Sequence, residues 1–354
     1  MVLRRDNLNP LPVKRYPGKT ALEEAVGSPV FNATATYPPT PLIANFNGGI
    51  PADKATLEDI GHRLNDIPAR LHSMDQSGIA YAVVSLTSPG IEGVADAATA
   101  IDFARRTNDA MYEQYVKAYP DRFAFFACVP MQDPVAAATE LERAVTQLGA
   151  KGVLINGFSN MNPNDFNEVR YLDHEACEPF WEMLTKLNVP LYLHPRNPPT
   201  SQQRLYEGKP SLAQSAFGFT VETAGHALRI MTSGLLDTYP NIQIILGHCA
   251  EALPFVINRV DHRMALGPRS QNGKHQKSMT HYLQHNIYAT TAGVRQLSAL
   301  RNTIDELGEE RVLFSVDYPY ESNEETADWF DGLEMSASSR RVLAAGNARR
   351  LLRL

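Results

Sequence analysis

Three apolar runs, far apart in the chain, each end on a residue that can bind a metal or carry a proton. Residues 189–194, 242–248 and 311–317 end on His194, His248 and Asp317. A run that is apolar throughout, without alternation, is typical of a strand buried on both faces, as in a parallel sheet. Because the carboxyl ends of parallel strands meet at one face of an α/β fold, we expect these three side chains to lie close together.

The rest of the chain repeats this alternation of strands and helices. From five further strands and the helices between them we predict an α/β fold, a (β/α)8 barrel of the TIM type. A doubly wound open sheet is the alternative, but the glycine-rich turn that would bind a dinucleotide after the first strand is absent. The five strands are expected at residues 20–23, 79–86, 122–129, 152–156 and 286–292, and the helices at 56–76, 95–119, 134–148, 178–188, 221–239, 297–307 and from 336 onward.

The length of 354 residues suits one large barrel or two ordinary domains. We expect a single barrel domain over residues 18–354, preceded by a surface extension at residues 1–17. Residues 27–52 are rich in proline, glycine and asparagine. A loop of this length inside a compact domain is usually functional, and it is often a lid over a site.

Composition narrows the classes of function. Hydrophobic residues make up 44% and charged residues 20% of the chain, which is typical of a globular protein. The net charge of −6 argues against nucleic acid or an anionic membrane as a partner, and no apolar run approaches the roughly 18 residues of a membrane span. The three cysteines are an odd number without metal-type spacing, so we expect no disulfide framework and a reducing, cytoplasmic location.

The predicted strand ends supply the ligands of a metal site. Glu23 ends the first predicted strand and joins His194 and Asp317, so two carboxylates and one imidazole are available. This set is enough for a single divalent cation with positions left open for substrate. Lys151 begins its strand rather than ending it, so it cannot bridge two ions as a carbamate. Taken alone, His194 also fits a hydrogen-bonded core histidine, and Asp317 also fits the cap of a turn.

A second pair of residues could exchange protons. His248 is followed by Glu251, which lies one turn further on and can orient the imidazole. Glu251 also suits the first turn of a helix simply because its charge complements the helix dipole. Both interpretations can hold together.

Four residues near the expected mouth are candidates for binding substrate. Arg196 follows His194 and could hold a carboxylate, although a salt bridge within the loop is equally compatible with its position. Asn156 ends its predicted strand. The aromatic residues Phe46 and Tyr318 suit an aromatic ligand, and they suit a packed rim equally well.

Six stretches of this sequence together resemble the amidohydrolase-related hydroxybenzoate decarboxylases, from about residue 18 to residue 354. The resemblance implies the barrel inferred above, one divalent metal held by Glu23, His194 and Asp317, and no organic cofactor. It also implies that His248 and Glu251 act as the acid–base pair. The stretches are ALEEA at 21–25, VLINGF at 153–158, LYLHPRN at 191–197, ILGH at 245–248, RVDH at 259–262 and FSVDYPYE at 314–321.

One departure from the family pattern bears on the metal. Many relatives carry Glu-x-His in the first strand, where this chain has Ala25 two residues after Glu23. The remaining ligands are mostly oxygens, so we expect Mg²⁺ or Mn²⁺ to be favoured over Zn²⁺. The 2,3-dihydroxybenzoate and salicylate decarboxylases resemble this chain in having alanine there.

The expected function is therefore the metal-dependent, non-oxidative decarboxylation of an ortho-hydroxybenzoate. The resemblance makes 2,3-dihydroxybenzoate, giving catechol and CO₂, the first candidate substrate, and it implies a homo-oligomer, a dimer or a tetramer. Salicylate and γ-resorcylate are alternative substrates, and a mononuclear metal-dependent hydrolase could use the same barrel. A catalytically silent barrel serving as a binding module is the remaining alternative, and the intact set of site residues argues against it.

Overall fold

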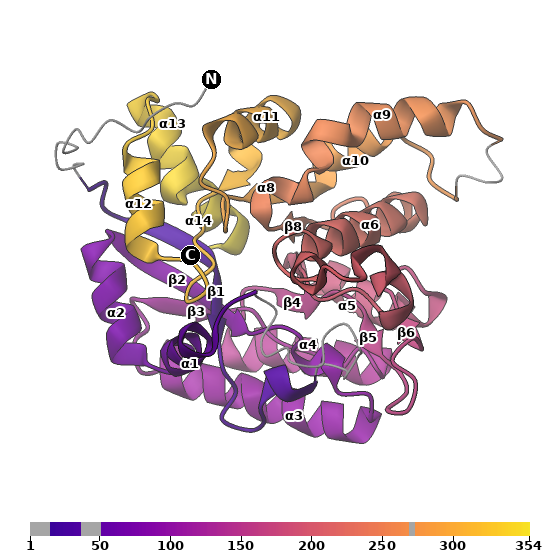
Figure 1. Ribbon diagram of the computed structural model, residues 1–354, viewed down its shortest axis with the longest axis horizontal. Coiled ribbons are helices and arrows are strands. Elements are labelled where there is room, and N and C mark those ends of the chain that lie inside the picture. Colours follow the sequence, from indigo (N-terminus) through magenta and orange to yellow (C-terminus); the bar gives the residue numbers. More distant parts are fainter. Residues whose placement is uncertain (1–14, 37–50, 269–272) are drawn as a thin grey trace.

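The described part of the chain forms a barrel of eight parallel strands surrounded by helices (Figure 1), so the predicted (β/α)8 barrel is confirmed. The computed structural model describes residues 15–36, 51–268 and 273–354. A small antiparallel pair, β5 (Ser159–Asn160) and β6 (Val169–Arg170), follows the fourth barrel strand. The barrel strands are β1 (Lys19–Val26), β2 (Ile79–Leu86), β3 (Phe123–Phe125), β4 (Val153–Asn156), β7 (Leu191–His194), β8 (Ile244–Leu246), β9 (Ile287–Thr290) and β10 (Val312–Leu313).

The helices follow the expected order, and two of the predicted ones are broken. The predicted helix at 56–76 is two helices, because Asp66 caps a new helix start. The predicted helix at 221–239 is interrupted at Gly234, which has a φ of 89°. The helices are α1 (Lys54–Arg63), α2 (Ile67–Gln76), α3 (Ala97–Met111), α4 (Pro134–Leu148), α5 (Glu178–Leu187), α6 (Gly218–Thr232), α7 (Leu235–Thr238), α8 (His248–Glu251), α9 (Leu253–Ala265), α10 (Met279–Asn286), α11 (Leu297–Leu307), α12 (Asn323–Asp331), α13 (Ala337–Arg341) and α14 (Asn347–Leu352).

Both faces of the strands are buried, which explains their continuous apolar runs. Along β7, Tyr192 points into the barrel, while Leu191 and Leu193 face the surrounding helices. Each of the eight strands gives one residue to the interior cluster. Ala348 and Leu352 of α14 belong to the same cluster. The strand residues of this cluster are Leu22, Val83, Ala124, Leu154, Tyr192, Ile245, Tyr288 and Leu313.

The barrel closes at two seams where strand pairing is sparse. The strands form one sheet in the order β1-β2-β3 and another in the order β10-β9-β8-β7-β4. An isolated bridge between Ala127 and Val153 joins β3 to β4, and one between Glu24 and Tyr318 joins β1 to the segment after β10. At the second seam the backbone N–H of Ala25 donates to Tyr318 O at 2.8 Å.

A β-bulge in β1 turns Glu23 into the barrel. Ala21 pairs with Ala82 and Glu24 with Val84, so β1 has one residue more than β2 over this stretch. Strict alternation from the inward Leu22 would turn the next side chain outward, and the extra residue lets Glu23 point inward as well. Glu23 therefore lies in the middle of β1, and the prediction that it ends the strand is wrong.

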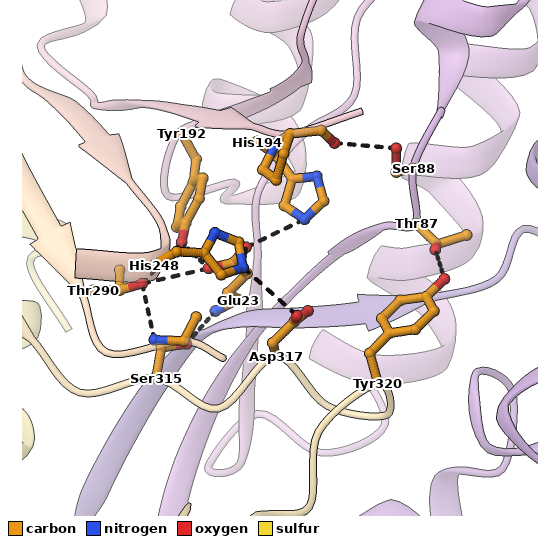
Figure 2. A network of polar contacts seen from close by, with 12 residues as sticks. Glu23, Thr87, Ser88, Tyr192, His194, His248, Thr290, Ser315, Asp317 and Tyr320 are labelled. Atoms are coloured by element: carbon orange, nitrogen blue, oxygen red, sulfur yellow. Dashed lines mark hydrogen bonds and ion pairs between the residues drawn. The ribbon is translucent and has the colours of Figure 1, made fainter. Parts of the chain in front are cut away.

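The Ser315 hydroxyl satisfies the backbone of this bulge across the seam. It accepts hydrogen bonds from the N–H of Leu22 at 3.2 Å and from the N–H of Glu23 at 2.7 Å (Figure 2). Ser315 is held in turn by Thr291, whose Oγ1 accepts from Ser315 N and donates to Ser315 O. A side chain thus replaces ladder hydrogen bonds at the point where β1 meets β10.

Some predicted features lie wholly or partly outside the described residues. Residues 1–14 of the expected extension and residues 37–50 of the expected loop, including Phe46, belong to this group. The described end of the extension is tied down, because Arg15 pairs with Asp328 at 2.7 Å. Among the described helices, none is both long and apolar enough to cross a membrane.

We predict that Ser315→Ala lowers the free energy of unfolding by about 1–3 kcal/mol, because two buried N–H groups lose their acceptor. Urea unfolding measures the effect. Ser211→Ala, at an exposed position of the chain, is the matched control and should change stability by less than about 0.5 kcal/mol. Equal stability of the two variants would contradict the role given to the Ser315 hydroxyl.

Candidate active site

Three potential metal ligands meet at the carboxyl end of the barrel, as the sequence predicts. Glu23 comes from β1, His194 is the last residue of β7, and Asp317 follows β10 (Figure 2). One ligand atom from each lies within 4.8 Å of the others. The parallel strands bring them together, since the strands end at one face.

Glu23 is held as a buried anion. Its Oε2 accepts hydrogen bonds from the Tyr192 hydroxyl and from Thr290 Oγ1, the latter at 3.3 Å. Burial raises the pKa of Glu23, but the charge of His248, the contact with His194 and the hydrogen bond from Tyr192 outweigh burial and lower this pKa to about 2. Oε1 faces His194 Nε2 at 3.2 Å and has no well-formed hydrogen bond among the described residues.

Two glycines leave room for these side chains. A Cβ at Gly247 would lie 2.7 Å from Glu23 Oε2, so any larger residue would displace the carboxylate. A Cβ at Gly293 would lie 2.9 Å from His248 Cδ2. Gly293 also has a φ of +63°, which other residues rarely adopt.

Asp317 faces the site from the opposite side of the seam. Its φ of 80° is unusual for a residue other than glycine and places the carboxylate beside the imidazoles. Oδ2 lies 3.8 Å from His248 Nε2. Burial raises the pKa of Asp317 to about 6, although the hydrogen bond and charge of His248 act to lower it. This carboxyl group is therefore suited to hold and to release a proton.

His248 and Glu251 form a close pair on an unusual turn. His248 Nδ1 lies 2.7 Å from Glu251 Oε1, and the Glu251 side chain is fully buried. Burial lowers the pKa of His248, but the carboxylates of Glu251, Glu23 and Asp317 raise it well above its ordinary value. The contact with Glu251 leaves Nε2 directed at Glu23 and Asp317, both at 3.8 Å.

The turn that carries this pair is left-handed. All five residues from His248 to Ala252 have positive φ, between 52° and 60°, although none is glycine. The sequence predicts that Glu251 lies one turn after His248, and the structure places it there on a left-handed rather than a right-handed turn. Such backbone costs roughly 1–2 kcal/mol for each residue, so the surrounding packing must hold it in place.

His194, His248 and Asp317 border one cavity, which we call the reactive cavity. It encloses roughly 440 Å³ when the open space at its mouth is included. Its wall combines hydroxyl groups with two aromatic rings. The lining residues are Ser88, His194, Pro195, Ser215, Phe219, Thr220, His248, Asp317 and Tyr320.

The donor set fits one divalent cation. Two carboxylates and one imidazole are common ligands, and the anionic Glu23 presents Oε1 to the space shared with His194 and Asp317. These ligands also leave positions open for substrate oxygens. Glu23 and Asp317 together supply more oxygen than nitrogen, which suits hard cations.

The structure places three predicted substrate contacts away from the reactive cavity. Arg196 is buried, and its guanidinium donates to Phe158 O at 2.7 Å and to Asn160 Oδ1 at 2.8 Å. Asn156 is also buried, and its amide lies 3.4 Å from Glu92 Oε2. Tyr318 packs its ring against the guanidinium of Arg70 on α2. These side chains therefore organise the barrel rim, and none of them lines the cavity.

Other side chains around the site were not identified from the sequence as its components. Tyr192 supports Glu23, and its position two residues before His194 on the same strand face was a usable signal. Ser315 likewise stands two residues before Asp317, whereas Thr290, the last residue of β9, precedes no predicted site residue at that spacing. Tyr320, in contrast, is one of the aromatic residues that the sequence places near the mouth, as is Tyr318, and of these two it is Tyr320 that lines the cavity.

The sequence matches a known protein family over most of its length. The amidohydrolase family profile matches residues 59–354. The chain belongs to the amidohydrolase family. The γ-resorcylate decarboxylase of Rhizobium sp. strain MTP-10005 is 39% identical to it over 338 residues, which span 95% of this chain and 98% of that protein.

Solved structures of this family agree with the fold. A 2,6-dihydroxybenzoate decarboxylase complexed with 2,6-dihydroxybenzoate superposes with a TM-score of 0.87 at 38% identity, covering 96% of this chain and all of that one. The dihydroxybenzoic acid decarboxylase from Polaromonas sp. JS666, with manganese and 2-nitroresorcinol bound, gives a TM-score of 0.87 at 39% identity and covers 96% and 98%. The chain is a carboxy-lyase of the hydroxybenzoate decarboxylase group. The manganese in the Polaromonas enzyme supports a divalent metal for this group.

We predict opposite effects for two substitutions of Ala252, which is exposed at the end of the left-handed turn. Ala252→Val should lower the free energy of unfolding by about 1–2 kcal/mol, because a β-branched side chain disfavours positive φ. Ala252→Gly should leave stability unchanged or raise it by up to about 1 kcal/mol. Urea unfolding of both variants measures the difference.

The control for this prediction is Ala110→Gly inside α3, where the backbone is ordinary helix. There glycine should lower stability by about 0.5–1 kcal/mol. If glycine at position 252 is as destabilising as glycine at position 110, the left-handed turn is not strained as described.

Proposed function

We propose that this carboxy-lyase removes CO₂ from 2,6-dihydroxybenzoate, also called γ-resorcylate, and that Glu23, His194 and Asp317 hold its metal. The observation that carries the proposal is the convergence of this ligand set and the His248–Glu251 pair on one small cavity. The pair provides proton transfer next to the place where a hydroxybenzoate would be held.

The choice of substrate rests on the relatives. Two of the similar proteins described above are named for γ-resorcylate or 2,6-dihydroxybenzoate, and one structure contains that acid. None of these names supports 2,3-dihydroxybenzoate, the first candidate from the sequence. The γ-resorcylate alternative therefore becomes the first candidate, and salicylate and 2,3-dihydroxybenzoate become comparison substrates.

The chemistry explains why such residues are needed. Direct loss of CO₂ would leave an anion in the plane of the ring, where the π system cannot stabilise it. Protonation of the ring carbon must therefore come first, and an ortho phenolate makes this carbon basic. A divalent cation bound by Glu23, His194 and Asp317 would supply positive charge that fixes the carboxylate and phenol oxygens and offsets their charge.

The side chains then divide the proton transfers. A cation bound by Glu23 and Asp317 would offset the carboxylate charges that raise the pKa of His248, so that the neutral imidazole, hydrogen-bonded through Nδ1 to Glu251, could accept the phenolic proton at Nε2. Asp317 delivers a proton to the ring carbon that carries the carboxylate. When the C–C bond breaks, its electron pair restores the aromatic ring and CO₂ leaves. His248 returns its proton to the phenolate, giving resorcinol, and one proton from solvent reloads Asp317.

We predict CO₂ release and resorcinol formation from 2,6-dihydroxybenzoate, slower turnover of 2,3-dihydroxybenzoate and salicylate, and none of 3-hydroxybenzoate, which lacks the ortho hydroxyl. Chromatography of the phenol products and detection of CO₂ measure the rates. Asp317→Asn, which cannot donate a carboxyl proton, should lower kcat by about 10²–10⁴-fold.

Two results would contradict this proposal in different ways. Equal turnover of 3-hydroxybenzoate would remove the role of the ortho phenolate. Faster turnover of 2,3-dihydroxybenzoate than of the 2,6 isomer would overturn the substrate assignment and leave the decarboxylase chemistry intact.

We predict that activity lost on chelation returns with Mn²⁺ or Mg²⁺ at least as well as with Zn²⁺, because the proposed ligands are mostly oxygens. Ala25 lies on the same face of β1 as Glu23 and packs against Ile60, Leu64 and Tyr320. Ala25→His would place an imidazole on that face and should tighten Zn²⁺ binding. Turnover and metal content are measured on the same samples. Stoichiometric zinc that survives chelation, with no activity from Mn²⁺ or Mg²⁺, would contradict the prediction.

A further inference from the structure

A second cavity lies directly behind one wall of the reactive cavity. We call it the side chamber. It encloses roughly 1100 Å³ including its open mouth, more than twice the space of the reactive cavity. Its lining residues are Gly27, Ser28, Pro29, Val30, Phe31, Asn32, Ala33, Leu57, Ile60, Gly61, Leu64, Asn65, Thr87 and Tyr320.

Tyr320 separates the two spaces. Of the lining residues named above, Tyr320 is the one that the two cavities share. Next to it the chain runs from Thr87, which lines the side chamber, to Ser88, which lines the reactive cavity. The wall between the cavities is thus one aromatic ring set against the carboxyl end of β2.

This ring is fixed at its tip and along its body. The Tyr320 hydroxyl shares a hydrogen bond with Thr87 Oγ1 at 2.5 Å (Figure 2). The ring packs against Ala25, Ile60 and Leu64, which join β1 to α1. A ring held at both ends makes a stiff partition. While Tyr320 stays in place, a substrate in the reactive cavity therefore cannot extend into the side chamber.

The side chamber is neutral, and its surface is somewhat more apolar than polar. Val30, Phe31, Leu57, Ile60 and Leu64 are its large aliphatic and aromatic side chains besides Tyr320. None of its lining residues, all within the described chain, is an acid, a lysine, an arginine or a histidine. Such a chamber suits an uncharged hydrocarbon group and does not suit a second acidic ring.

We propose that Tyr320 sets the size of ring substituent that this enzyme accepts, and that the side chamber is a preformed space that becomes a subsite for an alkyl substituent on a hydroxybenzoate once the Tyr320 ring is removed. The inference rests on the proposed function. With Tyr320 present, only acids whose rings fit the reactive cavity are turned over. Without its ring, the two cavities join and a substrate can extend into the side chamber.

Tyr320→Ala tests the partition. The substrates are 2,6-dihydroxybenzoate and its homologues with a propyl group at ring position 3 or 4, since the substituent that faces Tyr320 is one of these. Relative to wild type, Tyr320→Ala should raise the ratio of kcat/KM for one propyl acid over the parent acid by about tenfold or more, because three methylene-sized groups become buried. Calorimetric binding of the same acids gives a readout that is independent of turnover.

Two further variants separate size from hydrogen bonding. Tyr320→Phe keeps the ring and should keep the wild-type preference for the parent acid. Thr87→Val removes the hydrogen-bond partner and should raise the ratio by less than Tyr320→Ala does, because the ring can still block the opening. A larger change with Thr87→Val than with Tyr320→Ala would overturn the assignment of size selection to the ring.

A filled chamber is the decisive control. Gly61 lines the side chamber, and a Cβ added there meets no atom within 4 Å. Gly61→Leu in the Tyr320→Ala background should therefore cancel most of the gain for the propyl acid and leave the parent acid largely unaffected.

The outcomes distinguish this inference from the proposed function. If wild type does not decarboxylate 2,6-dihydroxybenzoate, the proposed function fails. If wild type is active and Tyr320→Ala binds and turns over parent and propyl acids in the wild-type ratio, the partition is wrong. If the gain appears but survives Gly61→Leu, the substituent does not occupy the side chamber and the subsite is wrong.

Discussion

The site depends on how β1 is joined to the segment after β10. Glu23 and Asp317 come from opposite sides of this seam, so their separation is set by whatever holds the two segments together. Besides the backbone bridge at Tyr318, a side chain makes this connection: the Ser315 hydroxyl accepts hydrogen bonds from the N–H groups of Leu22 and Glu23, where a bulge has removed them from the regular ladder. The bulge that aims Glu23 inward is therefore also the feature that needs Ser315.

Bringing three carboxyl groups together at the end of a barrel costs free energy, and neighbouring hydrogen bonds and opposite charges offset part of this cost. Glu23 and Glu251 are buried carboxyl groups and Asp317 is a half-buried one, and each lies within reach of the single imidazole of His248. Removing water from them raises their energy, while hydrogen bonds and opposite charges lower it. The left-handed turn after β8 adds backbone strain, yet it is what brings Glu251 under His248. Stability is thus given up where the chemistry is positioned, as at many functional sites.

The sequence predicts the parts of the site that follow from strand geometry. His194, His248 and Asp317 are found together because buried parallel strands show as apolar runs and end at one face. It does not predict side-chain direction beyond a strand end, where alternation stops. Arg196 follows His194 in the chain, yet it turns to Asn160 on β5, a partner that only the folded structure brings near. The sequence also does not predict the left-handed turn that begins at His248, because none of the residues with positive φ in it is glycine.

The outer side of the same seam explains why Tyr318 and Tyr320 differ. Glu24 and Tyr318 form the bridge that closes the barrel, and both meet Arg70 of α2. The guanidinium donates to Ala25 O at 2.5 Å, lies 4.0 Å from Glu24 and covers the Tyr318 ring at 4.6 Å. Burial raises the pKa of Glu24 to about 8, against the charge of Arg70, so this contact contributes packing and hydrogen bonding more than a full ion pair. The inner side of the seam thus carries the proposed metal ligands, and its outer side is held by Arg70, which Tyr318 contacts.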